Sequence, residues 1–315
     1  MRATVTLIAC IVAMTTACSN SSDDNTASTP LFDRYELSSP DSVPEGVTFD
    51  PQEDAFYATG LQGGSIVRID SAGRESVFRA ADNRARLGGV KIDAQQRRLW
   101  VCATQVDGTD NRVWVFNLAT AQLEMEFLLG ALTTNGACND LVLDSAGVAY
   151  VTDPANPYLY RLDPVTGTGS ILATDPLFDD ITRAGLGLNG IALTPDESAL
   201  IVGKYSPASL LRVSLPDADH IAVIPLTGDT LPSPDGLAIL NGDLYTVSND
   251  SVSRVRPNAE FSAGDVVTVM QKSGLSTATV AESQLYVIKS EVVNFVLSLP
   301  LNPPFEIFRV TTDAF

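Results

Sequence analysis

Apolar residues along this chain alternate with polar ones over short stretches, instead of recurring every three or four positions. Such alternation predicts half-buried β-strands rather than amphipathic helices, and the 22 Gly and 18 Pro scattered through the chain argue against long helices. One strand-like pattern recurs six times with a different residue at its start, which we call the head. The six heads are Glu45, Gly89, Asn139, Asn189, Asp235 and Thr277.

Successive heads are 44, 50, 50, 46 and 42 residues apart, a period in the range of four-stranded propeller blades. A turn with Asp, Pro or Gly follows each first strand, and a second strand then starts on an aromatic or apolar residue. We expect second strands at 55–60, 98–104, 148–153, 199–204, 243–248 and 284–290. The repeat therefore predicts an all-β fold, a six-bladed β-propeller, and six aligned strand pairs argue against an irregular sandwich with accidental spacing.

Strand-like runs also stand at both ends of the repeat region, at 32–38 and at 305–310. Closed propellers commonly join their ends by pairing an early segment with the last blade, and closure removes exposed strand edges. Either run is a candidate closing strand, and the sequence leaves the choice open.

Composition limits the possible partners. With 315 residues, 45% of them hydrophobic, the chain can bury a large core, and the repeat favours one folded domain at 34–315. The formal net charge of −18 without a basic patch excludes nucleic acid as a partner, because its phosphates would be repelled. We expect a monomer.

The first 17 residues form a short apolar run after a single basic residue, Arg2. The run is shorter than the ~20-residue helix that crosses a bilayer and is typical of an export signal. It ends in TTAC at 15–18 and is followed by a polar segment, which predicts a tether at 18–33. The junction resembles a bacterial lipoprotein signal with Cys18 as the lipidated first residue, although Thr15 stands where a Leu-like residue is usual.

We therefore expect an exported lipoprotein in the outer membrane and periplasm or at the cell surface, attached to the membrane only through its lipid anchor. Simple secretion after cleavage is the alternative.

The heads carry the candidate chemistry. In a propeller the first strand of each blade lines the central channel, so residues that begin these strands converge near the axis. Glu45, Asn139, Asn189 and Asp235 would present two carboxylates and two amide carbonyls, an all-oxygen set that suits Ca²⁺ before Mg²⁺. Zinc is disfavoured because neither His nor Cys stands at a head. Taken singly, each residue is explained by a turn or a solvated loop, and it is their common place in the repeat that indicates a central-channel metal site.

Four short motifs carry a resemblance to a known family. They are PEG at 44–46, ND at 139–140, NG at 189–190 and PDG at 234–236. From about residue 43 to its end the chain resembles the senescence marker protein (regucalcin) and gluconolactonase family, whose relatives include diisopropylfluorophosphatase and the paraoxonases. The resemblance implies hydrolysis of lactones, related esters or phosphotriesters, and a divalent cation, typically calcium, held by Glu45, Asn139, Asn189 and Asp235.

The chain departs from that family at two points. Ala137 stands where gluconolactonase-type members place an Arg that holds sugar hydroxyls, so sugar lactones are in doubt as substrates. Gly88 and Gly89 stand where paraoxonase-type members use a His as proposed base. The single histidine, His220, lies between two strand-like runs and is expected at the surface.

Without a His, a carboxylate must handle the proton of a hydrolytic reaction. Asp235 is the candidate base or nucleophile and Asp140 its partner behind the ligands, while the cation would polarise the substrate and lower the pKa of a bound water. Contacts to a small-molecule lactone or ester are expected where the second strands reach the same rim. These positions are Thr104, Asp153, Lys204, Tyr205, Asn249 and Lys289.

Two other function classes stay open. A non-catalytic metal- or ligand-binding propeller at the cell surface needs the same four ligands but no competent base. A protein-interaction propeller of the WD or NHL type needs no metal, and the lack of repeated Trp-Asp dipeptides counts against it.

Two cysteines fall in the folded part. Cys102 lies near the end of a second strand, and Cys138 immediately precedes Asn139 at the head of the next repeat. An exported protein meets an oxidising compartment in which such a pair can form a disulfide. The alternative, two small buried apolar side chains, is common for free cysteine.

The lipoprotein interpretation predicts that the protein fractionates with membranes and that its mature N-terminus is an acylated Cys18. Cys18→Ala should leave the chain uncleaved by the lipoprotein peptidase. Mass spectrometry of the N-terminal peptide decides the matter, and a mature N-terminus without acyl mass would contradict lipidation.

Overall fold

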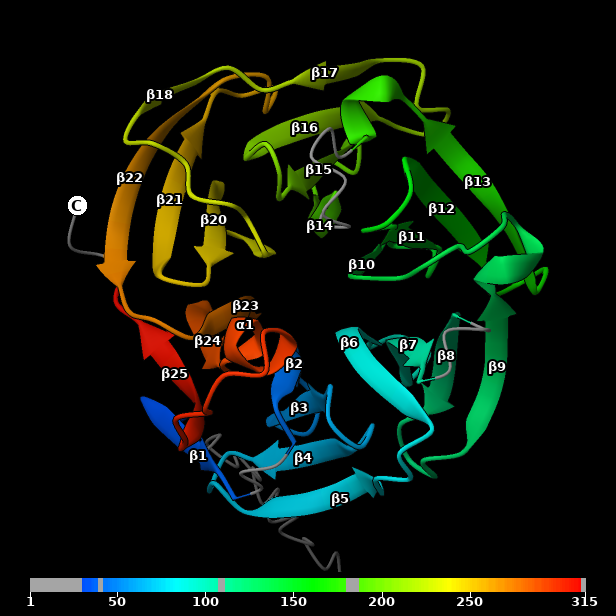
Figure 1. Ribbon diagram of the computed structural model, residues 1–315, viewed down its shortest axis with the longest axis vertical. Helices are drawn as coiled ribbons and strands as arrows, with labels where there is room; N and C mark the ends of the chain where they lie inside the picture. The colour runs from blue at the N-terminus through cyan, green and yellow to red at the C-terminus, as the bar shows by residue number, and fades with distance from the viewer. Residues whose placement is uncertain (1–29, 39–41, 107–110, 180–186, 313–315) are drawn as a thin grey trace, which may run out of the picture.

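The computed structural model describes residues 30–38, 42–106, 111–179 and 187–312. Within these ranges the strands form six sheets arranged as blades around a central axis (Figure 1), so the predicted six-bladed all-β propeller is confirmed. The predicted signal peptide, Cys18 and most of the tether lie outside the described residues.

Helical structure is a minor part of the described chain. It consists of α1 (Val292–Val296) and the 3₁₀ turns η1 (Leu129–Ala131) and η2 (Pro176–Phe178). Across the described ranges no helix has the length and apolarity needed to cross a membrane.

Each of the first three blades is an antiparallel meander whose strands follow one another outward from the axis. Blade 1 contains β2 (Pro44–Asp50), β3 (Ala55–Gly60), β4 (Ile66–Asp70) and β5 (Glu75–Arg79). Blade 2 contains β6 (Ala85–Asp93), β7 (Arg98–Gln105), β8 (Arg112–Asn117) and β9 (Leu123–Leu128). Blade 3 contains β10 (Leu141–Leu143), β11 (Ala149–Thr152), β12 (Tyr158–Asp163) and β13 (Thr168–Thr174).

The other three blades keep the same inner order and differ at their outer edges. Blade 4 contains β14 (Leu188–Leu193), β15 (Ala199–Lys204), β16 (Ser209–Ser214) and β17 (Ile221–Val223). Blade 5 contains β19 (Gly236–Leu240), β20 (Asp243–Ser248), β21 (Ser251–Pro257) and β22 (Gly264–Gln271), with β18 (Leu226–Gly228) added in parallel outside β22. Blade 6 contains β23 (Leu275–Ala281), β24 (Gln284–Lys289), β25 (Phe305–Val310) and β1 (Arg34–Leu37). The second strands start within one residue of their predicted positions.

Both terminal runs lie in the sixth blade, which answers the question that the sequence left open. β25 is the third strand, and β1 pairs with it in antiparallel register as the outermost strand, with Tyr35 opposite Ile307 (Figure 1). The Tyr286 hydroxyl donates to the Phe32 carbonyl over 3.0 Å, which fixes the chain just before β1. The N-terminal strand therefore closes the ring onto the C-terminal blade.

Apolar side chains from facing sides of neighbouring blades form the core, in six clusters among the described residues. Aromatic residues of the second strands contribute much of it, as with Tyr57, Trp100 and Tyr286, each of which is fully buried. Burying one such side chain stabilises the fold by roughly 1.5–3 kcal/mol. Because every cluster is shared by two blades, no blade has a complete core without its neighbours.

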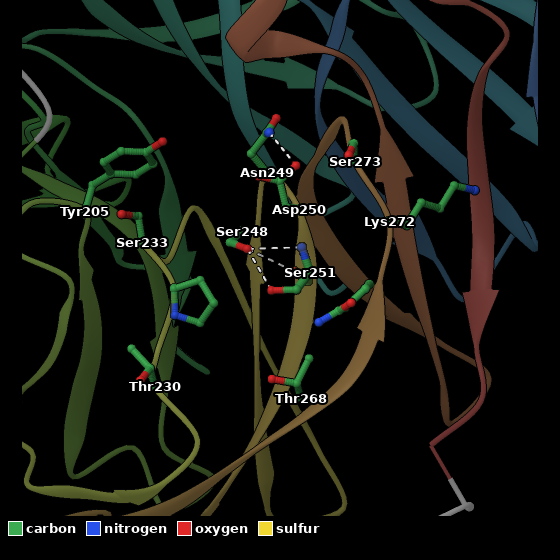
Figure 2. Close-up of a pocket in the computed structure, with 12 residues that line it drawn as sticks. Tyr205, Thr230, Ser233, Ser248, Asn249, Asp250, Ser251, Thr268, Lys272 and Ser273 are labelled. Atoms are coloured by element: carbon green, nitrogen blue, oxygen red, sulfur yellow. Dashed lines mark hydrogen bonds between the residues drawn. The ribbon is translucent and has the colours of Figure 1, made fainter.

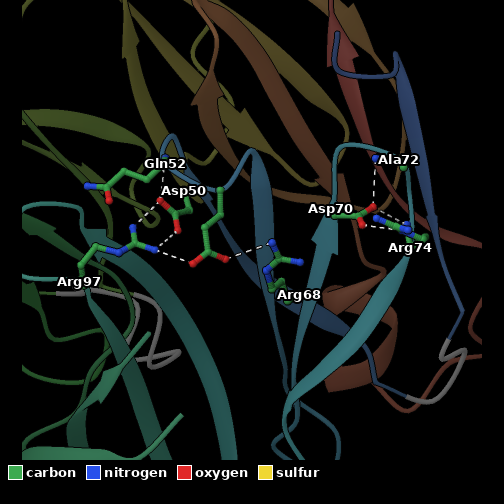
Figure 3. A network of polar contacts seen from close by, with 8 residues as sticks. Asp50, Gln52, Arg68, Asp70, Ala72, Arg74 and Arg97 are labelled. Carbon is green, nitrogen blue, oxygen red and sulfur yellow. Dashed lines mark hydrogen bonds and ion pairs between the residues drawn. The ribbon is translucent and has the colours of Figure 1, made fainter. Parts of the chain in front are cut away.

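An ion-pair network joins blades 1 and 2 at the turns after their first strands (Figure 3). Arg97 donates two hydrogen bonds of 2.7 Å to the two carboxylate oxygens of Asp50, which is fully buried. Arg97 also contacts Glu53, whose other oxygen lies 3.1 Å from Arg68. The bidentate geometry fixes the relative position of the two turns.

Asp50→Ala should lower the free energy of unfolding by about 2–3 kcal/mol, because it leaves the partly buried Arg97 guanidinium without its bidentate partner. Arg74→Ala is the matched control. The Arg74 side chain, which pairs with Asp70 in the same view (Figure 3), is mostly exposed, and its loss should change stability by less than about 0.5 kcal/mol. Chemical denaturation measures both, and equal effects would contradict the assignment.

Candidate functional site

The predicted heads meet around a small cavity at the centre of the ring. The cavity has a volume of about 10 Å³, the space of one water or one ion. Its polar walls are Glu45, Asn139, Asp140, Asp235 and Thr277. Asn189 is buried beside them, with its side-chain amide next to the Asp235 carboxylate. We call Glu45, Asn139, Asp140, Asn189 and Asp235 the oxygen cluster.

Irregular pairing at the start of the first strands turns the heads away from their own ladders. In four blades the register shifts at the head, for example between Pro44 and Val47 in β2 and between Leu188 and Ile191 in β14. In blades 3 and 5 regular pairing starts after the head, at Leu141 and Gly236. Such bulges re-aim side chains and leave backbone groups without a ladder partner.

Neighbouring blades supply the missing partners of the head carbonyls. Thr152 Oγ1 in blade 3 donates to the Asn189 carbonyl in blade 4 over 2.6 Å, and Ser276 Oγ in blade 6 donates to the Glu45 carbonyl in blade 1 over 2.6 Å. The Gly89 N–H of blade 2 donates to the Asn139 carbonyl of blade 3 over 2.9 Å. These inter-head hydrogen bonds position the side chains of the oxygen cluster.

The glycine after a head permits close approach of the next blade. A Cβ on Gly190 would lie 2.3 Å from the Asp235 carbonyl oxygen, and one on Gly46 would lie 2.5 Å from the Gly88 carbonyl oxygen. The Asn-Gly and Glu-Gly dipeptides are therefore required by inter-blade packing at the axis, which the turn interpretation of these motifs does not capture.

Several oxygens of the cluster are buried without a hydrogen-bond partner. They are Glu45 Oε2, Asp140 Oδ2 and Asn189 Oδ1, in residues that are 9%, 5% and 5% exposed. Burial raises the pKa of Asp235 to about 7, and the Asp140 charge adds to the shift. Burial also raises the pKa of Glu45 well above its usual value, with further contributions from Asp235 and Asp140.

Buried oxygens that lack donors and repel one another form an environment suited to a cation. Among the described residues no three His, Cys, Asp or Glu side chains form a metal-binding group by themselves. A cation at this position would therefore need the amide oxygens of Asn139 and Asn189 as well as carboxylates.

Two predicted substrate positions line a groove of about 830 Å³ beside the cluster (Figure 2). Tyr205 and Ser233 stand on one side, and Asn249 and Ser251 on the other. Burial raises the pKa of Tyr205, and the Asp235 charge adds to the shift. Ser233 in the groove lining stands two residues before the head Asp235, so the groove lies near the head of blade 5. Hydroxyl and amide groups dominate its lining.

The other charged positions predicted to contact substrate are engaged in local structure. Asp153 is fully buried and accepts hydrogen bonds from the Tyr160 hydroxyl over 2.6 Å and from the Ala137 N–H over 2.9 Å. Lys204 is buried and donates to the Leu177 carbonyl over 2.8 Å. Lys289 donates to the Asn302 carbonyl over 2.7 Å.

Desolvated charges take partners from nearby loops in this way, and the contact of these three residues with a substrate stays a prediction. Thr104 lies near the end of β7, opposite Arg86 and partly exposed. His220 is exposed, as expected.

Sequence reasoning missed Lys91 and the hydroxyls that hold the heads. Lys91 lies two residues after the head Gly89, on the channel side of β6, with Nζ 3.6 Å from Asp140 Oδ1. The one feature of the sequence that could have indicated Lys91 is its position two residues after a head. Nothing in the sequence marks Thr152 or Ser276 as inter-blade donors, since their acceptors lie in another blade.

Cys102 and Cys138 form a disulfide with a Cα–Cα distance of 5.4 Å. Cys102 belongs to β7 of blade 2, and Cys138 immediately precedes Asn139 at the head of blade 3. Both are buried in the cluster that the two blades share. The bond therefore fixes the segment that carries Asn139 and Asp140.

Comparison with known proteins supports the propeller fold and the family that the sequence motifs indicated. Residues 43–273 match the family described as SMP-30/Gluconolactonase/LRE-like region. Lactonase drp35 of Staphylococcus epidermidis strain RP62A is 26% identical over 221 residues, which cover 67% of this chain and 64% of that protein. Lactonase drp35 of Staphylococcus aureus strain USA300 is 27% identical over 222 residues with the same coverage. Each match thus spans less than two thirds of the relative's own length.

Solved structures resemble the chain in fold. The major allergen Mala s 1 of Malassezia sympodialis has a TM-score of 0.72 at 14% identity, covering 90% of this chain and 97% of that one. A gluconolactonase from Xanthomonas campestris has a TM-score of 0.63 at 18% identity, covering 89% of this chain and 88% of that one.

Replacing Cys102 and Cys138 together by Ala should lower the free energy of unfolding by about 2–4 kcal/mol, because the unfolded chain loses a cross-link. It should also weaken any ligand binding that uses Asn139. Peptide mapping of the native protein without reductant checks the premise: recovery of both cysteines as unlinked, alkylated peptides would show that they only pack.

Proposed function

The chain belongs to the SMP-30/Gluconolactonase/LRE-like family. We propose that it hydrolyses lactones or related esters with the help of one divalent cation, preferably Ca²⁺. The cation would be held by Glu45, Asn139, Asn189 and Asp235. The observation that carries the proposal is the group of three buried, unpartnered oxygens on Glu45, Asp140 and Asn189. The names of the lactonase relatives support the reaction class.

The donor set fits such an ion. Carboxylate and amide oxygens are the ligands that Ca²⁺ takes in flexible geometries. The raised pKa values of Glu45 and Asp235 reflect burial and mutual repulsion of negative charge, which a divalent cation relieves. When bound, the cation supplies a Lewis acid that polarises a carbonyl oxygen.

Asp235 and Asp140 have different roles in the proposed reaction. Asp235 is only partly buried, and it lies two residues after Ser233 of the groove lining. It is therefore the carboxylate that we assign to take a proton from a water beside the substrate. Asp140 Oδ1 accepts a hydrogen bond of 2.8 Å from the Leu141 N–H and contacts Lys91. Asp140 therefore links the oxygen cluster to the Leu141 backbone and to Lys91.

The groove would hold the substrate. Its hydroxyl and amide groups, among them Asn249, Ser251 and Thr268, can donate and accept hydrogen bonds to polar ring substituents. The two charged residues of its lining, Asp250 and Lys272, have opposite signs and offset each other. We therefore favour neutral, polar lactones or esters as substrates.

We also propose that the activity belongs to the cell envelope, with Cys18 as the lipid anchor and the propeller as a monomer. The Cys102–Cys138 disulfide supports export, because such bonds persist mainly in oxidising compartments.

The test combines calcium calorimetry with a panel of lactones, aryl esters and phosphotriesters, assayed with and without chelator. We expect one Ca²⁺ per chain, lactone hydrolysis that chelator abolishes, and a thermal midpoint raised by calcium, because a bound ion stabilises only the folded state. Asn189→Ala should weaken calcium binding roughly tenfold or more, since ligand number sets affinity.

Asn258→Ala, in the exposed turn between β21 and β22, is the matched control and should bind calcium normally. Calcium binding without hydrolysis of any substrate would favour the non-catalytic surface propeller. Unchanged calcium binding in the Asn189 variant would refute the ligand set.

A further inference from the structure

Lys91 lies between two cavities on the propeller axis. It lines the small cavity of the oxygen cluster and also a larger one of about 460 Å³, formed by later residues of the first strands such as Phe49, Val142 and Leu237. Of the described residues that line these two cavities, Lys91 is the single Lys or Arg. A lysine in this place occupies the axial path directly behind the cluster.

The ammonium group of Lys91 contacts the cluster electrostatically. Its Nζ is 3.6 Å from Asp140 Oδ1, and its side chain is 20% exposed. Its charge also acts on Glu45, where it opposes the rise in pKa caused by burial and the other carboxylates. Lys91 thus interacts with two different carboxylates of the cluster.

The charges of the site balance in a simple way. With all three carboxylates ionised, as they would be around a bound cation, Glu45, Asp140 and Asp235 bring three negative charges. Lys91 brings one positive charge, so the net charge is −2. One divalent cation neutralises this set, whereas a trivalent or second divalent ion would leave excess positive charge in a poorly solvated channel. Asp140 Oδ2, Glu45 Oε2 and Asn189 Oδ1 stay without partners within the cluster, so Lys91 does not satisfy the oxygens that face the cavity.

We propose that Lys91 is a built-in counter-ion that matches the oxygen cluster to one divalent cation and disfavours trivalent or additional ions. The inference rests on the proposed function, because it assumes that the cluster binds a cation. Lys91 is a positioning residue for Asp140 and acts on the ion through charge rather than as a ligand.

The test compares Lys91→Met with Lys91→Arg by calorimetry, using Ca²⁺ alone and Tb³⁺ alone as probes. Removing one positive charge should raise Ca²⁺ affinity roughly tenfold and Tb³⁺ affinity roughly thirtyfold, because the electrostatic effect grows with ion charge. Lys91→Arg keeps the charge and should bind both ions like the wild type. Lys272→Met is the matched control, because Lys272 pairs with Glu306 in blade 6 and lines the groove instead of the small cavity of the oxygen cluster.

A charge-restoring variant covers the case in which Lys91→Met does not fold. Asp140→Asn alone lowers the cluster charge and should weaken Ca²⁺ binding, whereas Asp140→Asn with Lys91→Met returns the net charge to −2 and should recover much of the affinity. Failure of this double variant to fold would show that Lys91 acts through packing and would overturn the inference. So would a Lys91→Met variant with wild-type or weaker Ca²⁺ affinity, or a Lys91→Arg variant as tight as Lys91→Met.

Thermal unfolding in chelator separates this inference from the proposed function. Without any ion, Lys91→Met should melt below the wild type and Lys91→Arg should not, because the Asp140 carboxylate loses the ammonium group that lies 3.6 Å from it. If wild-type protein binds no cation at all, the proposed function fails, and the melting comparison still decides the role of Lys91. If wild-type protein binds Ca²⁺ but all Lys91 variants melt and bind alike, only the inference fails.

Discussion

The hydrogen bonds between the heads of neighbouring blades are the interaction on which this structure most depends. At each head the chain leaves its own strand ladder, so a carbonyl near the axis needs a donor from elsewhere. The Thr152 hydroxyl supplies one to Asn189, and the Ser276 hydroxyl supplies one to Glu45 across the closure of the ring. With the backbone held in this way, the head side chains point to a common centre instead of pairing along a strand.

The rest of the ring serves to keep these heads in place. Each apolar cluster is shared by two blades, and β1 closes the sixth blade, so no blade edge near the axis can move independently of its neighbours. The disulfide between Cys102 and Cys138 adds a covalent bond beside Asn139, between blades 2 and 3. A rigid ring of this kind can hold hydrogen-bond acceptors close together although they repel one another.

The oxygen cluster is such an unfavourable arrangement. Three carboxylates lie together with buried oxygens that have no donors, and burial raises the pKa of Asp235 and of Glu45. Groups of this kind concentrate at functional sites, where the stability of the surrounding structure offsets their local cost. Lys91 compensates part of the negative charge from below, and the groove at Tyr205 opens beside the cluster. Under the proposed function, the site has an inner side, where Lys91 offsets part of the negative charge, and an outer side through which a substrate would enter.

The sequence alone determined the fold and the heads that line the central cavity, because both follow from local patterns repeated in order. Alternating strands and the period of the heads predict six blades, and a common place in the repeat brings Glu45, Asn139 and Asp235 to one cavity. Only the tertiary structure decided the features that depend on contacts between segments far apart in the sequence. It placed both terminal strands in one blade.

The structure also gave the charged rim residues their actual partners. Asp153 and Lys204 became internal supports because burial requires each charge to find a nearby partner, and that partner depends on how the loops fold. Lys91 reads in the sequence as an ordinary strand residue after a glycine head. Only the packing of the blades around the axis shows that its ammonium group lies next to Asp140.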